Sequence, residues 1–497
     1  MCNKHNYFFP QKRLFRCFDV QLFSEFDKIQ TTPSFGYIFP KVDNSVMLYL
    51  VTMPLSCGAF RSLLVFSYLL QTKSLFCAYC PSLLVDPGHF TNKYIFFKED
   101  HFMKKPLEGI FVVEYSTYWV APATAQWLRC LGARVIKVET GATGDSTRYF
   151  GRTCGMPITD DENPSFDMFN GGKEFVHLDF DKEEDMKVMH NMLEKADIFL
   201  SSIRLGGLKK RGLDYDSLKE KYPRLIMGHA TGYGSEPGPM SELPGLDAVA
   251  FFGMNGLLRD LPLDEGHTPF CPPTGMGDTT TGMALFSGVM TALFNRERTG
   301  KGDYVATSLY GAGNWVTGPV NNGTQYFNPW PRSRGTQSPL GNAYLTKDGE
   351  YVQLFVNEYN KYFPVFCKAF GMEEYIGKPE YADRANINKN DFATCRELVA
   401  RATEEAKKRT AKEILDVLQA GNVPCTRLRH IEDKYKEQEQ LDQCLANGYI
   451  GDITYPSGKH YYQPQMPVFF KSLGVQNYAR ASRALGADNE AIIKEFN

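Results

Sequence analysis

Three kinds of pattern are missing from this sequence, and each absence excludes a class of function. The longest uncharged apolar run, residues 46–60, is interrupted by Pro54 and Gly58 and is shorter than the roughly 20 residues of a membrane-spanning helix. The motifs G-x-x-x-x-G-K-[ST] and H-E-x-x-H are absent, so neither a phosphate-binding loop nor a zinc-protease helix is expected. A net charge of -2 gives no basic excess for nucleic acid. We therefore expect neither a membrane nor a nucleic-acid partner.

Cysteine also lacks the spacing of a metal site or a disulfide framework. The 12 cysteines are scattered singly, and the close pair Cys77-Ala-Tyr-Cys80 has no second Cys or His pair at ligand spacing. No metal is therefore expected. Dispersed cysteines in a large chain indicate a reducing compartment, and we predict a cytoplasmic location.

Residues 1–102 differ in composition and in hydrophobic pattern from the rest of the chain. They are crowded with Phe, Tyr, Cys and Leu but show no clear period, whereas regular patterning begins at Met103. We predict that residues 1–102 are an extension outside the working fold, and a membrane-associated or targeting segment is the alternative. The remainder divides into a large domain (103–330), a small domain (331–440) and a C-terminal segment (441–497) that returns to the large domain.

Strands and helices alternate from residue 103 onward, which predicts an α/β fold. Residues 109–115 and 132–139 have the pattern of buried strands, and the helix expected between them has Pro122 in its first turn. Single helices separate the strands that follow, and such alternation predicts a parallel, Rossmann-like sheet. These further elements are expected as strands at 173–180, 197–200, 224–227 and 304–309 and as helices at 182–196 and 215–222.

The strand ends of such a sheet are where a ligand is expected. The first loop carries no G-x-G-x-x-G, so NAD is not expected although Glu139 ends the second strand. Arg148 and Arg204 follow other strands, and either is a candidate for binding an anion or a solvated surface charge.

The character of the chain changes near Asn342, which predicts a smaller α+β domain. A strand is expected at 351–356, followed by helices at 361–370, 391–408 and 411–420. The C-terminal segment is expected to hold short strands at 449–455 and 467–470 and a last helix near Asn489.

The stretch 275–303 is the one around which the site is expected. Gly275 and Gly277 break the preceding segment, and Asp278 stands where a helix N-cap is expected, before apolar residues with a helical period. A carboxylate at that place lies near unpaired backbone N–H groups. Capping alone would explain Asp278, and the alternative is a role in catalysis.

A series of short motifs runs in order through residues 104–497. It comprises Ala121-Pro-Ala, Leu131-Gly-Ala-x-Val-Ile-Lys-Val-Glu139, Asn170-x-x-Lys173, Gly277-Asp278-x-x-x-Gly282 and Thr299-Gly-x-Gly302. Together these motifs resemble the class III CoA-transferases, the family of formyl-CoA, carnitine and bile-acid transferases. Thr231-Gly-Tyr-Gly234 and Pro244-Gly-Leu-Asp247 are most similar to members from anaerobes that exchange CoA between aryl- or alkyl-substituted acids and 2-hydroxyacids.

The resemblance implies a reaction and a set of site residues. CoA would move from an acyl-CoA to a free carboxylic acid through an aspartyl-CoA thioester on Asp278, with CoA as co-substrate and no permanently bound cofactor. It also implies an interlocked homodimer, and a 2-hydroxyacyl-CoA dehydratase as a further partner. The residues expected to contact CoA are Trp119, Val120, Leu178, Arg204 and Lys210, with Lys137 and Arg148 as further candidates.

The intermediates must be kept from water. We expect Tyr118, Trp119, Phe251 and Phe252 to form walls, with ordinary core packing as the alternative. The polyglycine loop of the formyl-transferring members is replaced here by residues 333–339.

Other functions stay open. The related 2-methylacyl-CoA racemases have His-Asp where this chain has Leu246-Asp247, and loss of one acid/base group disfavours racemisation. A CoA-thioester-binding subunit of a dehydratase complex would bind without turnover. A carnitine- or bile-acid-type transferase would differ in its acceptor.

Overall fold

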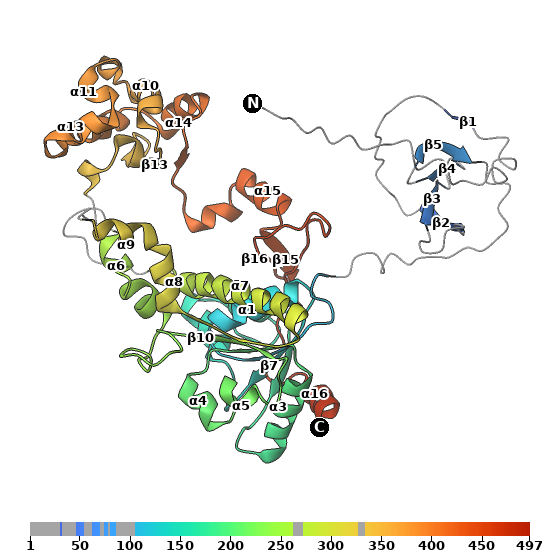
Figure 1. The fold of residues 1–497 in the computed structure, drawn as a ribbon. Coiled ribbons are helices and arrows are strands. Elements are labelled where there is room, and N and C mark those ends of the chain that lie inside the picture. Colours follow the sequence, from blue (N-terminus) through green and yellow to red (C-terminus); the bar gives the residue numbers. More distant parts are fainter. Residues whose placement is uncertain are drawn as a thin grey trace, which may run out of the picture. The chain divides into compact units, whose positions relative to one another are not determined.

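The computed structural model describes residues 105–261, 272–326 and 333–497, together with the backbone of five short strands before them (Figure 1). The chain divides into two compact units, Met1–Lys104 and Lys105–Asn497. The first holds an antiparallel sheet in the order β1-β5-β4-β3-β2, made of β1 (Gln30–Thr31), β2 (Val46–Met53), β3 (Ser62–Leu69), β4 (Ser74–Cys77) and β5 (Cys80–Val85). The sequence pattern predicts none of these strands. The side chains of Cys77 and Cys80 lie outside the described residues, and the role of the segment stays a prediction.

Strands between Phe111 and Ser308 form a six-stranded sheet. Its order is β11-β10-β9-β6-β7-β8, and every neighbouring pair is parallel. The strands are β6 (Phe111–Tyr115), β7 (Arg134–Glu139), β8 (Glu174–His177), β9 (Ile198–Ser201), β10 (Ile226–Thr231) and β11 (Tyr304–Ser308). The predicted parallel sheet is confirmed. Because the chain runs outward from β6 in one direction and then from β9 in the other, a crevice opens between these two strands.

Apolar side chains cover both faces of this sheet. Val112 and Val113 are consecutive in β6 yet belong to different core clusters, since successive strand residues face opposite sides. On one face lie α1 (Val120–Cys130) and α7 (Met276–Thr299), which also pack against each other. On the other lie α3 (Glu183–Lys195), α4 (Leu205–Lys210) and α5 (Tyr215–Leu218) (Figure 1). Apolar residues on both faces explain why the strands read as nearly continuous hydrophobic runs.

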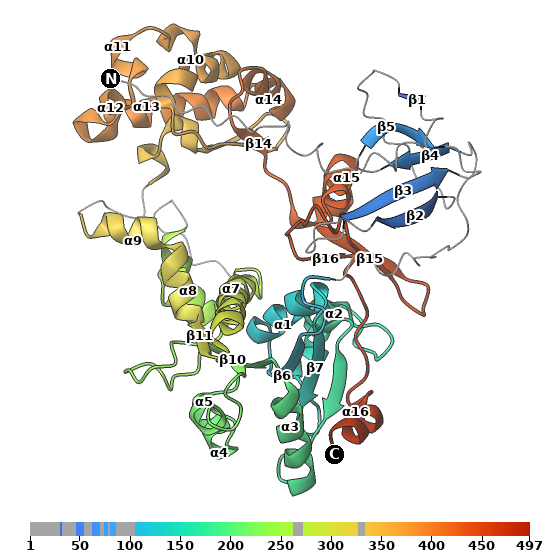
Figure 2. The same cartoon turned by 45° about the vertical axis from the view of Figure 1, so that its right-hand side comes forward.

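The last helix, α16 (Asn489–Phe496), lies beside α3 (Figure 2). Phe496 stacks on Phe111 of β6 with ring centroids 5.7 Å apart. The Asp488 carboxylate accepts the backbone N–H of Phe175 in β8 at 2.9 Å. The end of the chain is thus fixed to the large domain through both apolar and polar contacts.

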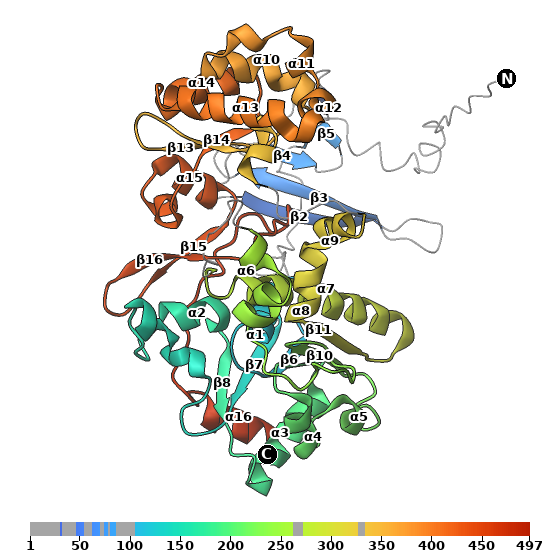
Figure 3. The same ribbon diagram turned by 90° about the vertical axis from the view of Figure 1, so that its left-hand side faces the viewer.

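A separate hydrophobic core, with buried residues from Leu340 to Val423, forms around a three-stranded sheet. The antiparallel strands β12 (Ala343–Leu345), β13 (Tyr351–Leu354) and β14 (Cys425–Arg427) carry α10 (Tyr359–Phe370), α13 (Lys389–Ala406) and α14 (Ala411–Ala420) (Figure 3). The aromatic face of α10 explains the packing, since Phe363, Phe366 and Phe370 are all buried. The remaining helices of the described residues are α2 (Pro164–Asn170), α6 (Leu257–Asp260), α8 (Leu309–Val316), α9 (Gly318–Thr324), α11 (Pro379–Ala382), α12 (Arg384–Ile387) and α15 (Gln438–Ala446).

The strand predicted at 467–470 is wrong. The partner of β15 (Ile450–Thr454) is β16 (His460–Pro464). The turn between them contains Gly458 with a φ of +83°, a conformation that glycine adopts readily. The chain therefore reverses at Gly458, and the second strand begins at His460 and not at the apolar residues 467–470. Over the described ranges, no helix has both the length and the apolar character needed to cross a membrane.

Candidate active site

The start of α7 is held against the loop that follows β6. Gly275 is the N-cap, with a φ of +85°, and Asp278 is the third helical residue. The prediction that Asp278 is the N-cap is therefore wrong. A Cβ on Gly275 would lie 2.5 Å from the Trp119 ring, so both the conformation and the close contact require glycine. The Asp278 carboxylate consequently lies in the first helical turn, where backbone N–H groups lack intrahelical partners.

The capping role belongs to Asp247 instead. Its Oδ2 accepts the backbone N–H of Gly277 at 3.1 Å, and the residue is 6% exposed. In the sequence, Asp247 is notable only beside Leu246. Its capping role could not be predicted, because Asp247 is 30 residues from Gly277 and capping signatures connect residues that are close in sequence.

The site holds two buried carboxyl groups with raised pKa values. Burial, with a smaller contribution from the charge of Asp247, raises the pKa of Asp278 to about 7. Burial also raises the pKa of Asp247, against the lowering effect of the N–H groups of Gly277, Asp278 and Gly275. Asp278 itself is 8% exposed. A carboxylate with so little hydration is well placed for attack on a carbonyl carbon once it is ionised.

Asp278 opens on a cavity at the point where the sheet order reverses. This switch-point cavity has a volume of about 930 Å³. Its walls come from the loops after β6, β9 and β10 and include Tyr118, Val120, Ser202, Arg204, Lys209, Thr231 and Asp278. Ser202 fixes two of these loops together, because its Oγ accepts the N–H of Thr117 at 3.0 Å and donates to the Thr117 carbonyl at 2.8 Å. The predicted candidates Val120, Arg204 and Asp278 thus meet in one cavity.

Two predicted candidates are instead engaged in buried ion pairs. Lys137 is fully buried, and its Nζ lies 2.8 Å from Glu114 Oε1 and 3.0 Å from Asp145 Oδ2. Burial opposes its charge, but these carboxylates outweigh burial and raise the pKa of Lys137. Arg148 donates to both carboxylate oxygens of Glu139, at 2.9 and 2.6 Å. Neither side chain lines the switch-point cavity.

The other three candidates, Leu178, Lys210 and Trp119, do not line it either, and Trp119 lines a second cavity described below. Leu178 is 1% exposed and belongs to the core cluster of α3 and α16. Lys210 is exposed at the end of α4, and its neighbour Lys209 lines the cavity in its place. Lys209 was missed because a helix of only six residues is too short to show a period from which the direction of its side chains can be inferred.

A second cavity borders the same helix start on another side. This aromatic cavity, about 640 Å³, is lined in part by Gly275, Met276 and Thr279 of the helix start and by Trp119, Phe150, Met156, Met168, Phe169, Tyr455 and Tyr461. Glu162 and Lys459 are its charged lining residues. The Trp119 ring stacks on Phe169 at 5.6 Å and meets Phe150 edge-on at 4.7 Å.

The four predicted aromatic walls separate into two pairs. Tyr118 and Trp119 line the switch-point and aromatic cavities respectively. Phe251 and Phe252 are buried in the core, where Phe251 packs so closely under Gly277 that a Cβ there would lie 2.6 Å from its ring. Phe251 and Phe252 are therefore core residues, as the alternative interpretation expects.

A family comparison decides what kind of protein this is. The model of CoA-transferase family III matches residues 107–489. The chain belongs to CoA-transferase family III. The predicted family and the predicted enzyme class, a CoA-transferase with acyl-CoA and acid substrates, are thereby confirmed.

Individual relatives of this family III transferase agree over most of its length. It is 34% identical over 397 residues to (R)-2-hydroxy-4-methylpentanoate CoA-transferase of Clostridioides difficile, covering 78% of this chain and 97% of the relative. It is 32% identical over 392 residues to cinnamoyl-CoA:phenyllactate CoA-transferase of Clostridium sporogenes, covering 78% and 92%. The crystal structure of a CAIB/BAIF family protein from Brucella suis superposes with a TM-score of 0.66 at 26% identity, covering 80% of this chain and all of that one.

The described side chains of this transferase show which metal-binding and ionisable groups are available at the site. Within residues 105–261, 272–326 and 333–497, no cluster of three or more His, Cys, Asp or Glu could hold a metal ion. The charged and ionisable groups at the switch-point cavity are Tyr118, Arg204, Lys209, Glu242 and Asp278. Of these, Asp278 is the buried carboxylate at the helix start.

Proposed function

We propose that this CoA-transferase moves CoA from an acyl-CoA to a free 2-hydroxyacid or aryl-substituted acid through an aspartyl-CoA thioester on Asp278. The observation that carries the proposal is the position of Asp278. Its carboxylate is buried in the first turn of α7 and opens on a cavity of about 930 Å³. Such a group can form an acyl bond without a separate base, because an ionised carboxylate is itself a nucleophile.

The proposed reaction conserves the energy of the thioester. An Asp278 oxygen attacks the acyl-CoA carbonyl carbon, the carbon–sulfur bond breaks, and CoA thiolate leaves a mixed anhydride. The thiolate attacks the aspartyl carbonyl carbon, releasing the first acid as a carboxylate and forming aspartyl-CoA. The acceptor carboxylate then attacks the aspartyl-CoA carbonyl carbon, which expels CoA thiolate and forms a second mixed anhydride. The thiolate attacks the acceptor's carbonyl carbon in that anhydride, which gives the new acyl-CoA and frees the Asp278 carboxylate. Each step exchanges one acyl bond for another, and charge is conserved throughout.

We propose that CoA occupies the switch-point cavity. Parallel sheets bind nucleotide-containing ligands at such a reversal of strand order, and Arg204 and Lys209 offer exposed cations for the phosphates of CoA. We leave Lys137 and Arg148 out of the proposed contacts because their cationic groups are already paired with Glu114, Asp145 and Glu139. Leu178 is left out as a core residue.

We propose that the acid's side chain occupies the aromatic cavity. Its walls are predominantly apolar, and Trp119, Phe150 and Phe169 offer ring surfaces. The names of the two relatives specify a branched alkyl 2-hydroxyacid in one case and phenyllactate in the other. Acids of these two kinds are therefore the first to test as acceptors.

The test is CoA exchange between a panel of acyl-CoAs and free acids, followed by mass analysis of the new thioester. The proposal expects exchange with branched alkyl and aryl 2-hydroxyacids and none with Asp278→Asn. Binding of acyl-CoA without any exchange would support the alternative of a dehydratase partner subunit. Loss of the 2-proton without transfer would support the racemase alternative.

We also propose that the enzyme is a homodimer. Large apolar side chains are exposed on α7 and the helices after it, with Phe294 at 68% and Trp315 at 85%, and exposed patches of this kind favour protein contacts. Sedimentation velocity should show twice the chain mass. The interlocked arrangement, the dehydratase partner and the cytoplasmic location stay predictions.

A further inference from the structure

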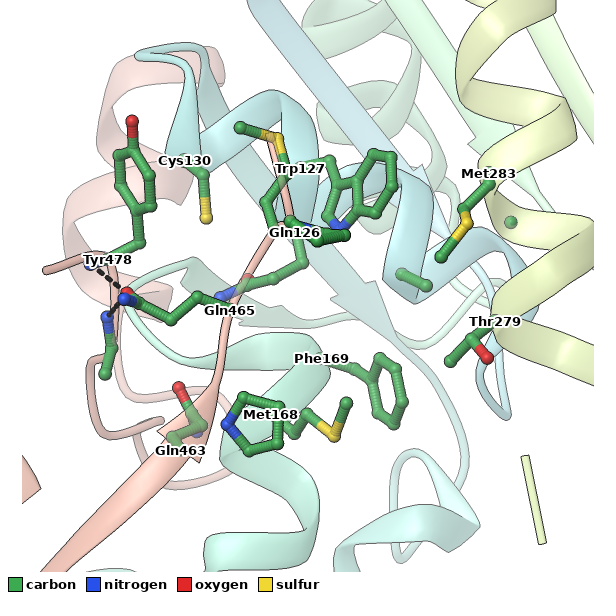
Figure 4. Close-up of a pocket in the computed structure, with 16 residues that line it drawn as sticks. Gln126, Trp127, Cys130, Met168, Phe169, Thr279, Met283, Gln463, Gln465 and Tyr478 are labelled. Carbon is green, nitrogen blue, oxygen red and sulfur yellow. Dashed lines mark hydrogen bonds between the residues drawn. The ribbon is translucent and has the colours of Figure 1, made fainter. Parts of the chain in front are cut away.

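A third cavity lies beside the aromatic cavity, between α1, α7 and the segment that follows β16. This cavity, called the inner cavity, has a volume of about 210 Å³ and reaches the surface at Met283, which is 41% exposed. It is lined in part by Trp127, Cys130 and Met283 and by the amides of Gln126, Gln463 and Gln465 (Figure 4). No Asp, Glu, Lys, Arg or His lines it. Engineered apolar cavities of about 150 Å³ hold benzene, so the inner cavity has room for several methylene groups or one ring.

The aromatic and inner cavities share one wall. Met168, Phe169 and Thr279 line both of them, and Figure 4 shows these three on the side of the inner cavity opposite Cys130. A single layer of side chains therefore separates the place proposed for the acid's side chain from further space with a mostly apolar lining.

Two of the three wall residues are held in place. Phe169 is 7% exposed and stacks on Trp119. Thr279 donates its hydroxyl to the carbonyl of Gly275 at 2.9 Å, so it is bound to the turn that begins α7. Moving either side chain would disturb the start of the helix that carries Asp278.

Met168 is the third wall residue, and its side chain has no such restraint. It is half-buried on α2 and packs beside Trp119, Ala123 and Phe169. A methionine side chain is unbranched, has three rotatable bonds, and adapts to its neighbours at little cost. The length of the apolar space open to an acid therefore depends on this residue.

We propose that Met168 determines the length of acid the enzyme accepts, by closing the aromatic cavity and keeping the acid's tail out of the inner cavity. The inference rests on the proposed function. Removing the Met168 side chain beyond Cβ joins the two cavities. Each methylene of a longer acid that then becomes buried is expected to raise kcat/KM about fourfold.

The experiment measures kcat/KM for straight-chain 2-hydroxyacids of increasing length with the wild type, Met168→Ala and Met168→Leu. In Met168→Ala the preferred length should increase by two or more methylenes, with a gain of about 10-fold or more for the longer acids. Met168→Leu, which nearly conserves volume, should keep the wild-type preference. An unchanged length preference in Met168→Ala overturns the inference.

Two further variants separate a local effect from general loosening. Met186 is half-buried on α3 and lines none of the three cavities. Met186→Ala, which removes the same side chain away from the proposed acid site, should leave the preferred length unchanged. Met283 lines only the inner cavity, so adding Met283→Trp to Met168→Ala should cancel the gain.

The outcomes also distinguish failure of the proposed function from failure of the inference about Met168. If the wild type transfers CoA to no acid, the proposed function fails, and this inference fails with it. If transfer occurs but Met283→Trp does not cancel the gain in Met168→Ala, the inner cavity is not where the longer acid binds, and this inference alone is overturned.

Discussion

The carboxylate of Asp247 accepts the backbone N–H of Gly277 at 3.1 Å, one residue before Asp278. A residue on η5 (Asp247–Gly253) thereby satisfies a free donor at the start of α7. Its negative charge also adds to the effect of burial on the pKa of Asp278. Asp247 thus influences both the position and the ionisation of the proposed nucleophile.

The first prediction concerns the pH dependence of activity. Because the pKa of Asp278 is raised to about 7 and the carboxylate must be ionised to attack, kcat/KM should rise with pH, with a midpoint near pH 7, and level off above about pH 8. Asp247→Asn keeps an oxygen acceptor for Gly277 but removes the charge, so the midpoint should move to lower pH. A midpoint that stays in place would show that Asp247 exerts no electrostatic effect on Asp278.

The second prediction concerns stability. The folded-state pKa of Asp278, about 7, lies above its ordinary value of 3.8. The protonated carboxyl therefore stabilises the fold at low pH, and this contribution falls as pH rises from 3.8 toward 7. The free energy of unfolding of Asp278→Asn, relative to that of the wild type, should increase by about 2 kcal/mol between about pH 5.5 and about pH 8. Urea unfolding at the two pH values measures the difference, and a pH-independent difference would contradict the raised pKa.

The third prediction separates two adjacent lysines. Lys209 lines the switch-point cavity with Arg204, whereas Lys210 is exposed beside it. Arg204→Ala and Lys209→Ala should each raise KM for acyl-CoA about 10-fold, as expected for loss of a charge-assisted hydrogen bond to phosphate. Lys210→Ala should change KM less than twofold. Equal effects of Lys209→Ala and Lys210→Ala would argue for a different path of the phosphates.

The fourth prediction tests the role of Lys137. Its ammonium group is fully buried between Glu114 and Asp145, so Lys137→Met should lower the free energy of unfolding by about 3–5 kcal/mol. Lys210→Met, at an exposed position, should change it by less than about 0.5 kcal/mol. KM for acyl-CoA in the folded Lys137→Met protein should match the wild type. A large rise in KM would restore Lys137 as a CoA contact.

Much of the large domain follows from its sequence. The buried strands read as apolar runs because both faces of the sheet are covered, as Val112 and Val113 show. Asp278 was found because a carboxylate after glycines at a helix start is visible locally. The residues that cap the helix could not be identified in this way. Gly275 has the N-cap conformation, and the Asp247 carboxylate makes the capping hydrogen bond.

The two cationic candidates that do not line the switch-point cavity, Lys137 and Arg148, have a common physical cause for their position. Sequence places a residue on a strand but not the charges facing it, so Lys137 and Arg148 could not be distinguished from free cations before Glu114 and Glu139 were located. The aromatic cavity combines Trp119 with Tyr455 and Tyr461, which are more than 300 residues away in the chain. Only the return of the C-terminal segment brings such residues together.

The most direct test of the account is the mass of the enzyme after incubation with acyl-CoA. We expect a covalent CoA or acyl adduct that maps to Asp278, is released by hydroxylamine, and is absent from Asp278→Ala. An unmodified wild-type enzyme during demonstrable CoA transfer, or an adduct that persists in Asp278→Ala, would contradict it.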